Sequence, residues 1–130
     1  MKGKEALKVM AFDCELNGKV VSWGGSGLAN SLLELAGGKN VFANVDKQFP
    51  HVTWEEVIAA NPDLIVIDAY EDDDGGKAKV ELLKNNPQTA ELDAVKNNRF
   101  LIIPLFSIFP SIQNVNAVEA MSEALLNIQK

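Results

Sequence analysis

The sequence contains few side chains of the types that perform catalysis. Among its 130 residues there is one histidine, His51, and one cysteine, Cys14. We expect a surface-loop histidine and a small buried apolar cysteine, because neither has the companions that a catalytic or metal-binding set needs. Dinucleotide, Walker-type and nucleophile-elbow motifs do not occur. These observations predict a protein that is not an enzyme and that holds no cofactor and no resident metal.

A glycine-rich turn is the first candidate binding feature. Gly24, Gly25 and Ser26 directly precede an apolar helical pattern. Free backbone N–H groups at a helix start can bind an anionic group. The same turn can instead require glycine only for its backbone angles. The sequence supports both interpretations, and they are compatible with each other.

An acidic segment, Glu71–Asp74, is the second candidate. It lacks the alternating ligands and distal glutamate of an EF-hand loop, which weakens its interpretation as a cation site. A solvated turn and a docking patch for a basic partner are the alternatives.

The elements that must position these features follow from the hydrophobic pattern. Strands are predicted at residues 7–13, 20–23, 40–42, 64–68 and 99–103, and helices at 26–36, 53–61, 77–85 and 111–129. Strands that alternate with helices predict an α/β fold, a three-layer sandwich with a mostly parallel central sheet and helices on both faces. The composition, 47% hydrophobic and 23% charged, is that of one globular domain over residues 1–130.

Local signals refine three of these elements. Asn17-Gly18 predicts a hairpin turn, since both residues tolerate positive φ. Thr53 and Glu56 have the spacing of a capping box. The continuous apolar runs at 64–68 and 99–103 predict buried strands. The helix after the glycine turn is predicted to bury a face formed by Leu28, Leu32 and Leu35.

Ligands of open α/β sheets bind beyond the carboxyl ends of the strands. Loops at 23–26, 68–72 and 106–110 have this position, and they carry aromatic rings with a few hydroxyl groups. Such a set suits a bulky, partly apolar ligand, although rings of this kind also fill the edge of a core. The candidate ligand-binding residues are Trp23, Gly24, Gly25, Ser26, Asp68, Tyr70, Phe106, Ser107 and Phe109.

Charge and hydropathy limit the partners and the location. The net charge of −6 predicts that nucleic acid is not a partner, because phosphate binding needs a basic surface. No apolar stretch has the roughly 20 residues of a membrane span. The first residues lack the apolar core of a signal peptide. Taken alone, this predicts a cytosolic chain, and a fragment without its leader would look the same.

Four segments, in this order, resemble the C-terminal half of the class III (helical-linker) periplasmic binding proteins. Residues 37–41 match a G-G-x-N-hydrophobic phrase. Residues 52–64 match a hydrophobic-S/T-x-E phrase followed by P-D-hydrophobic, and residues 94–99 match A-V-K/R-N-x-R. The run at 111–118 is most similar to members for iron(III)–siderophore uptake. The resemblance covers nearly the whole chain.

The resemblance implies a binding protein with two α/β lobes, joined by one long helix, that delivers its ligand to an ABC permease outside the cytoplasm. Iron–siderophore, haem and cobalamin complexes are the ligands that it implies. This chain would be the C-terminal lobe, without the first lobe, the linker helix and the leader, and would supply half of the cleft. Acidic residues on the outer surface of such a lobe meet permease arginines, with Glu71 and Asp72 as the candidates here.

Two other classes compete with this hypothesis. Residues 62–75 also resemble the phosphoacceptor segment of a response-regulator receiver domain, in which Asp68 would be phosphorylated with Mg²⁺. Only Asp13 is available as the second acidic group after the first strand, and no lysine follows a later strand. The third class is a cytosolic α/β scaffold without a ligand.

Overall fold

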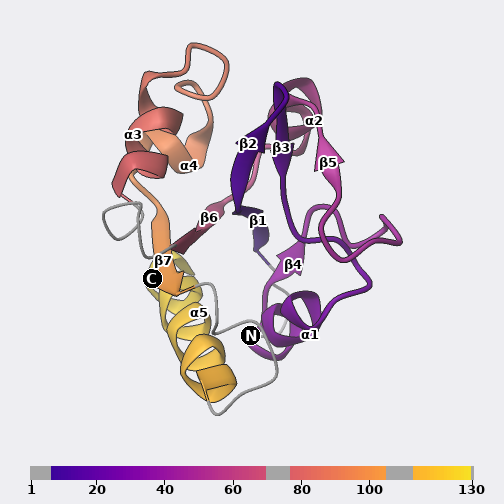
Figure 1. Ribbon diagram of the computed structural model, residues 1–130. Coiled ribbons are helices and arrows are strands. Elements are labelled where there is room, and N and C mark those ends of the chain that lie inside the picture. The colour runs from indigo at the N-terminus through magenta and orange to yellow at the C-terminus, as the bar shows by residue number, and fades with distance from the viewer. Residues whose placement is uncertain (1–6, 70–76, 105–112, 130) are drawn as a thin grey trace.

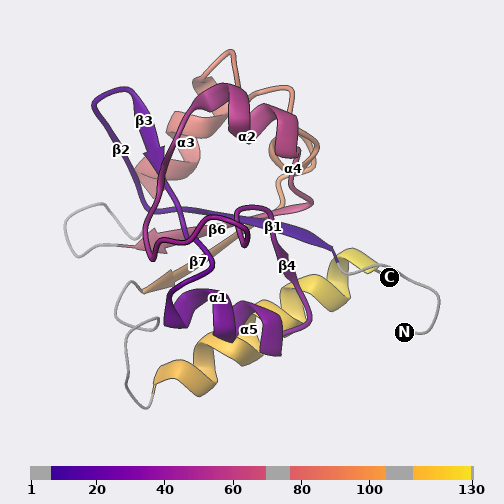
Figure 2. The ribbon, with the colours of Figure 1, turned by 90° about the vertical axis from the view of Figure 1, so that its right-hand side faces the viewer.

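The computed structural model describes residues 7–69, 77–104 and 113–129, and the following account concerns these residues. Four parallel strands form the central sheet, in the order β4-β1-β6-β7. These strands are β1 (Lys8–Phe12), β4 (Lys39–Asn40), β6 (Leu64–Ala69) and β7 (Phe100–Pro104). Two helices cover one face, α1 (Leu28–Leu35) and α5 (Gln113–Gln129). The other face carries α2 (Trp54–Ala60), α3 (Lys77–Asn85) and α4 (Asp93–Lys96) (Figures 1 and 2). The predicted three-layer α/β sandwich is confirmed.

Alternation along the strands divides the core between the two faces of the sheet. Val9 and Ala11 of β1, with Leu64 and Val66 of β6, belong to the cluster on the α1–α5 side. Met121 of α5 is fully buried in the same cluster. Each large apolar side chain buried in this way contributes about 1.5–3 kcal/mol, so this face holds α5 on the sheet.

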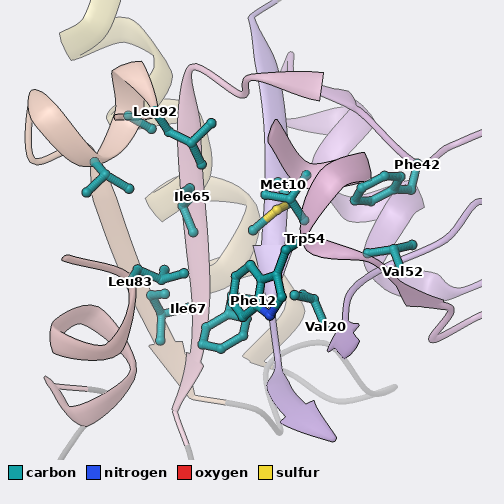
Figure 3. Close-up of a cluster of buried hydrophobic side chains, with 13 residues drawn as sticks. Met10, Phe12, Val20, Phe42, Val52, Trp54, Ile65, Ile67, Leu83 and Leu92 are labelled. Atoms are coloured by element: carbon teal, nitrogen blue, oxygen red, sulfur yellow. The ribbon is translucent and has the colours of Figure 1, made fainter. Parts of the chain in front are cut away.

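The opposite face forms the second cluster, shown in Figure 3. Met10 and Phe12 of β1 lie beside Ile65 and Ile67 of β6. Trp54, the first residue of α2, packs its ring near Phe12 at 6.2 Å between centroids and 44° between planes. This tilted arrangement suits the quadrupoles of two aromatic rings. It fixes α2 over the carboxyl end of β1.

A hairpin extends from the carboxyl end of β1. It consists of β2 (Cys14–Leu16) and β3 (Lys19–Val21), and β3 also pairs with β5 (His51–Val52) in a small antiparallel sheet. Asn17 and Gly18 have φ of 52° and 79°, the positive values that a two-residue hairpin turn with the right twist requires. The predicted Asn-Gly hairpin is therefore confirmed.

The ends of α2 are as the sequence predicts. The Thr53 hydroxyl accepts the Glu56 backbone N–H at 3.1 Å, and the Glu56 carboxylate accepts the Thr53 N–H at 3.1 Å. This reciprocal capping box satisfies two N–H groups that the helix itself leaves without acceptors. Asn61 ends the helix in the left-handed region, with φ of 41°.

Helix α1 ends in a glycine motif, and its buried face differs from the prediction. Gly37 has φ of 98° and donates to the Glu34 carbonyl at 3.0 Å, while Gly38 donates to the Leu33 carbonyl at 3.1 Å. These two bonds are those of a Schellman motif. Leu35 is 75% exposed, so its assignment to the core was wrong. The buried residues of α1 are Ala29, Asn30, Leu32 and Leu33.

Strand β7 is an edge strand, which corrects the prediction of a strand buried on both faces. Among the described residues, no strand pairs with β7 on the side opposite β6. Ile102 is 40% exposed, whereas Ile103 is buried against the α1–α5 cluster. By contrast, β6 lies inside the sheet and is buried from Leu64 to Asp68, as its apolar run predicts.

Candidate functional site

The carboxyl ends of β1 and β6 bring two acidic residues to neighbouring positions. The strands pair in parallel with Phe12 opposite Ile67, so the next residues, Asp13 and Asp68, follow side by side. The Asp68 side chain lies on the face of α1 and α5, because it bonds Trp23, which packs in the cluster of that face. Asp13 is 5% exposed and Asp68 is 0% exposed. This end of the sheet is where the sequence places the candidate site.

Asp68 occupies an unusual environment for a carboxyl group. Its Oδ2 accepts the indole N–H of Trp23 at 2.9 Å, while its Oδ1 is buried and has no hydrogen-bond partner. Burial, with a further contribution from the charge of Asp13, raises the pKa of Asp68 to about 8, against the opposing effects of the Trp23 hydrogen bond and of Lys79. At neutral pH the group is therefore predominantly protonated.

Two further residues complete this cluster. Lys79 of α3 donates from Nζ to the backbone carbonyl of Asp68 at 2.5 Å and so connects α3 to the end of β6. Cys14 begins β2 and is half-buried, which partly corrects the expectation of a buried cysteine. Burial first, and the charge of Asp13 second, raise the pKa of the Cys14 thiol. Sequence reasoning missed Lys79, because a lysine on a polar helix gives no sign of where its amine reaches.

Trp23 reaches the site from the α1–α5 side and belongs to the core. Its side chain is 0% exposed and packs within the cluster of that face. Of the two interpretations of the aromatic rings, contact with a ligand or filling of the core edge, this burial favours the second for Trp23. The ring fills the core, and its one polar atom donates to Asp68. Trp23 thus contacts this end of the sheet through its hydrogen bond to Asp68.

The glycine turn after Trp23 is closed by the chain at residues 43–48. Gly24 donates to the Gln48 carbonyl at 3.0 Å, Gly25 to the Val45 carbonyl at 2.8 Å, and Ser26 to the Lys47 carbonyl at 3.4 Å. The backbone N–H groups of these three residues are therefore occupied by carbonyl oxygens of the chain. This contradicts the interpretation of Gly24, Gly25 and Ser26 as an anion-binding turn. The Ser26 hydroxyl likewise donates to the Asp46 carboxylate at 2.5 Å.

The glycines are required by close approach of the backbone and not by their φ values. A Cβ on Gly24 would lie 2.0 Å from the Lys47 carbonyl oxygen, and one on Gly25 would lie 2.1 Å from that of Ala43. Asn40, buried at the end of β4, holds the turn from the other side by donating to the Trp23 carbonyl at 2.9 Å. Asn40 is the asparagine of the G-G-x-N phrase. The sequence therefore contained this residue, but it did not show that the Asn40 amide holds the glycine turn.

The remaining predicted site residues lie outside the described part of the chain. These are the ligand candidates Tyr70, Phe106, Ser107 and Phe109 and the docking candidates Glu71 and Asp72. They stay predictions.

Three surface hollows formed by described residues lie away from the Asp13–Asp68 end. One of about 520 Å³ lies between α3 and β7 and is lined by residues such as Val80 and Phe100. Two others lie at the amino ends of the strands, near Arg99 and near Lys39. Within the described ranges, no three acidic, histidine or cysteine side chains are grouped as a metal would require. No helix among those residues has the length and apolar character to cross a membrane.

The chain has a parallel sheet with helices on both faces and polar groups at the carboxyl ends of the strands. This arrangement defines an open α/β unit, a class in which ligands bind beyond the carboxyl ends of the strands. Comparison with known proteins gives the family. The family model "Periplasmic binding protein" matches residues 2–105. The chain therefore belongs to the periplasmic binding protein family, a family of binding proteins.

Individual relatives agree with this membership. A periplasmic binding protein from Veillonella parvula is 34% identical with a TM-score of 0.84, over 95% of this chain and 43% of that one. An ABC-type Fe³⁺-hydroxamate transport system protein from Saccharomonospora viridis is 28% identical with a TM-score of 0.78, over 92% and 41%. A vitamin B12-binding protein from Photorhabdus laumondii is 36% identical over 61 residues, which are 47% of this chain and 20% of the relative. The chain thus spans less than half the length of these relatives.

Family membership removes the receiver-domain alternative. The structure adds a physical reason, because Asp68 is fully buried, is engaged by Trp23 and is predominantly protonated at neutral pH. A phosphoacceptor must be ionised and open to the phosphoryl donor. The β2–β3 hairpin after the first strand also separates Asp13 from the helix that would follow it in a receiver.

Proposed function

We propose that this chain is the C-terminal lobe of an extracytoplasmic solute-binding protein, and that it supplies half of the ligand cleft to an ABC importer. The observation that carries the proposal is the match of 95% of this chain to 43% of the Veillonella parvula protein. An α/β unit that covers less than half of a relative fits one lobe of a two-lobe protein. The phrases at 37–41, 52–64 and 94–99 also follow one another in the order that resembles the C-terminal half of the class III periplasmic binding proteins.

The proposed ligand is a bulky metal chelate, with an iron(III)–siderophore complex first and haem or a cobalamin as related choices. The names of two relatives support this class, since one is an Fe³⁺-hydroxamate transport protein and another binds vitamin B12. The candidate contacts Tyr70, Phe106 and Phe109 are aromatic, and flat rings suit a large, partly apolar complex. In this proposal Ser107 adds a hydroxyl contact.

Glu71 and Asp72 are the proposed docking residues for the permease. Carboxylates at the rim of an interface steer a basic partner and fix its orientation. Reversal of both charges in the two-lobe parent is expected to abolish stimulation of the permease ATPase while ligand affinity stays unchanged. Unchanged stimulation would remove these two residues from the docking surface.

The ligand assignment is tested by calorimetric titration of the 130-residue chain with ferrioxamine B, haemin and cyanocobalamin. We expect saturable binding of one of the three, weaker than about 1 μM because half a cleft provides half of the contacts. Tyr70→Ala is expected to remove this binding. Leu126→Ala is the matched control, since Leu126 is 57% exposed on α5. Absence of saturable binding for all three compounds refutes the ligand class.

A further inference from the structure

We propose that a hollow at the amino ends of β6 and β7 binds a small organic carboxylate with an apolar body, and that Arg99 binds its carboxylate group. The hollow has a volume of about 480 Å³, which lies in the range of small-molecule sites. The candidate site described above lies at the opposite end of the sheet, so this is a second site. It does not depend on the proposed function.

The hollow lies where two strands begin and a helix ends. Figure 2 shows the carboxyl end of α5 on the side of the sheet from which the parallel strands start. The residues that form the hollow come from the first residue of β6, from the start of β7 and from the last turns of α5. They include Leu64, Asn98, Arg99, Ala124, Asn127 and Ile128.

Arg99 supplies the positive charge of the hollow. It is the only arginine of the sequence, and its side chain is half-buried. In the described part of the chain, no hydrogen bond or ion pair joins its guanidinium to another residue. A guanidinium has five N–H donors, and it binds a carboxylate through two parallel hydrogen bonds. A carboxylate is therefore the ligand group that matches it.

The backbone that carries this side chain is fixed on both sides. The Arg99 N–H donates to the Ala94 carbonyl at 2.7 Å, and the Arg99 carbonyl accepts the Ile65 N–H at 3.1 Å. Asn98 has φ of 56°, which asparagine adopts more readily than most residues, and its N–H donates to the Val95 carbonyl at 3.1 Å. Binding at a fixed backbone loses less conformational freedom.

The remaining wall of the hollow suits the other part of such a ligand. Leu64 is 2% exposed, and Ala124 and Ile128 are half-buried, so the three residues offer an apolar surface. The side-chain amides of Asn98 and Asn127 are further N–H donors. Among the described residues that line the hollow, none is acidic. One positive charge thus stands beside an apolar wall.

Two negative groups near the hollow leave this charge in excess. Asp63 precedes Leu64, but its Oδ2 accepts the Lys8 backbone N–H at 2.8 Å. The carboxyl end of α5 carries about half an elementary negative charge, which favours a guanidinium beside it and is smaller than the guanidinium charge. An anion is therefore attracted, and an apolar body adds contact with the wall that a bare inorganic anion cannot make.

The experiment is a titration of the isotope-labelled chain with sodium benzoate, in which NMR follows the backbone amide signals of Asn98, Arg99 and Asn127. Ionic strength is held constant, because salt weakens a partly exposed charge pair. We expect saturable shifts of these signals with a Kd on the order of 1 mM. Benzamide has the same shape without the charge, and acetate has the charge without the ring. Each is expected to bind at least about tenfold more weakly.

Three variants locate the binding. Arg99→Gln is expected to weaken benzoate binding at least about tenfold, because it removes the charge and keeps a polar side chain. Asn127→Asp, at an exposed position of α5, should weaken it at least about fivefold by placing a like charge in the hollow. Lys19→Gln, at an exposed position of β3, changes the net charge as Arg99→Gln does. This matched control should keep the parental Kd within about twofold.

Shifts that stay linear up to about 50 mM benzoate, or saturable shifts confined to other residues, overturn the proposal. Equal affinity for benzoate and benzamide, or equal affinity of the parent chain and Arg99→Gln, does so as well. If Arg99→Gln does not fold by circular dichroism, an unchanged affinity of Asn127→Asp overturns it. The titration with ferrioxamine B, haemin and cyanocobalamin concerns the other end of the sheet, so failure of either proposal leaves the other in place.

Discussion

The free energy of unfolding should fall as pH rises through the neutral range, and Asp68 should be the cause. The pKa of Asp68 is about 8 in the folded chain and 3.8 in a free aspartate. Between these values the folded chain retains a proton that the unfolded chain has lost. Stability from this group is complete below the lower pKa and is lost as pH approaches the upper one.

The magnitude follows from proton linkage. One proton held only by the folded state gives a slope of about 1.4 kcal/mol per pH unit. From about pH 5 to about pH 7 the fall attributable to Asp68 is on the order of 3 kcal/mol, which is a large share of a stability of about 5–15 kcal/mol. Water that reaches the site in the folded state reduces this figure, so it is an upper value.

Urea denaturation at a series of pH values measures the effect. Asp68→Asn should abolish the slope and should be more stable than the parent chain near pH 7, because it has no proton to take up on folding. Glu119→Gln, at an exposed position on α5, is the matched control and should keep the parental slope. If Asp68→Asn retains the slope over this range, the burial of Asp68 does not control the pH dependence and the reasoning fails.

Three other substitutions, the last with a matched control, test separate parts of the fold by the same denaturation assay. Thr53→Ala removes the capping box and should cost about 1 kcal/mol; no change would mean that the cap contributes nothing. Gly25→Ala places a Cβ 2.1 Å from the Ala43 carbonyl oxygen and should cost more than about 2 kcal/mol; a neutral effect would disprove the close approach. Met121→Ala empties a fully buried position and should cost about 2–5 kcal/mol, whereas Leu126→Ala on the exposed side of α5 should cost under about 0.5 kcal/mol. Equal costs would contradict the assigned face.

Local signals in the sequence were reliable because their physics is local. The Asn17-Gly18 turn needs two positive φ values, and the capping box of Thr53 needs a helix start with Glu56 at the right spacing. Both features are complete within a few residues, and both are confirmed. The three-layer fold could also be predicted, since it follows from the alternation of apolar strands and helices.

The failures concern partners that are distant in sequence. Helical spacing alone gave Leu35 a buried position, but the direction from which α5 approaches α1 decides the buried face. An apolar run cannot tell an inner strand such as β6 from the edge strand β7. The contact of Trp23 with Asp68 and the closing of the Gly24–Gly25 turn by residues 43–48 depend on tertiary structure, so neither the aromatic nor the glycine pattern could predict them.

The order of the strands has a consequence for how the chain folds. The β2–β3 hairpin is made of residues adjacent in sequence and can form within microseconds. The sheet cannot follow at that rate, because Val9 of β1 pairs with Leu64 of β6, and closing so long a loop carries a large entropy cost before any contact repays it. During synthesis, β1 therefore has to wait for β6 with its apolar faces uncovered. We expect the hairpin to form early and the docking of β6 to limit the rate of folding.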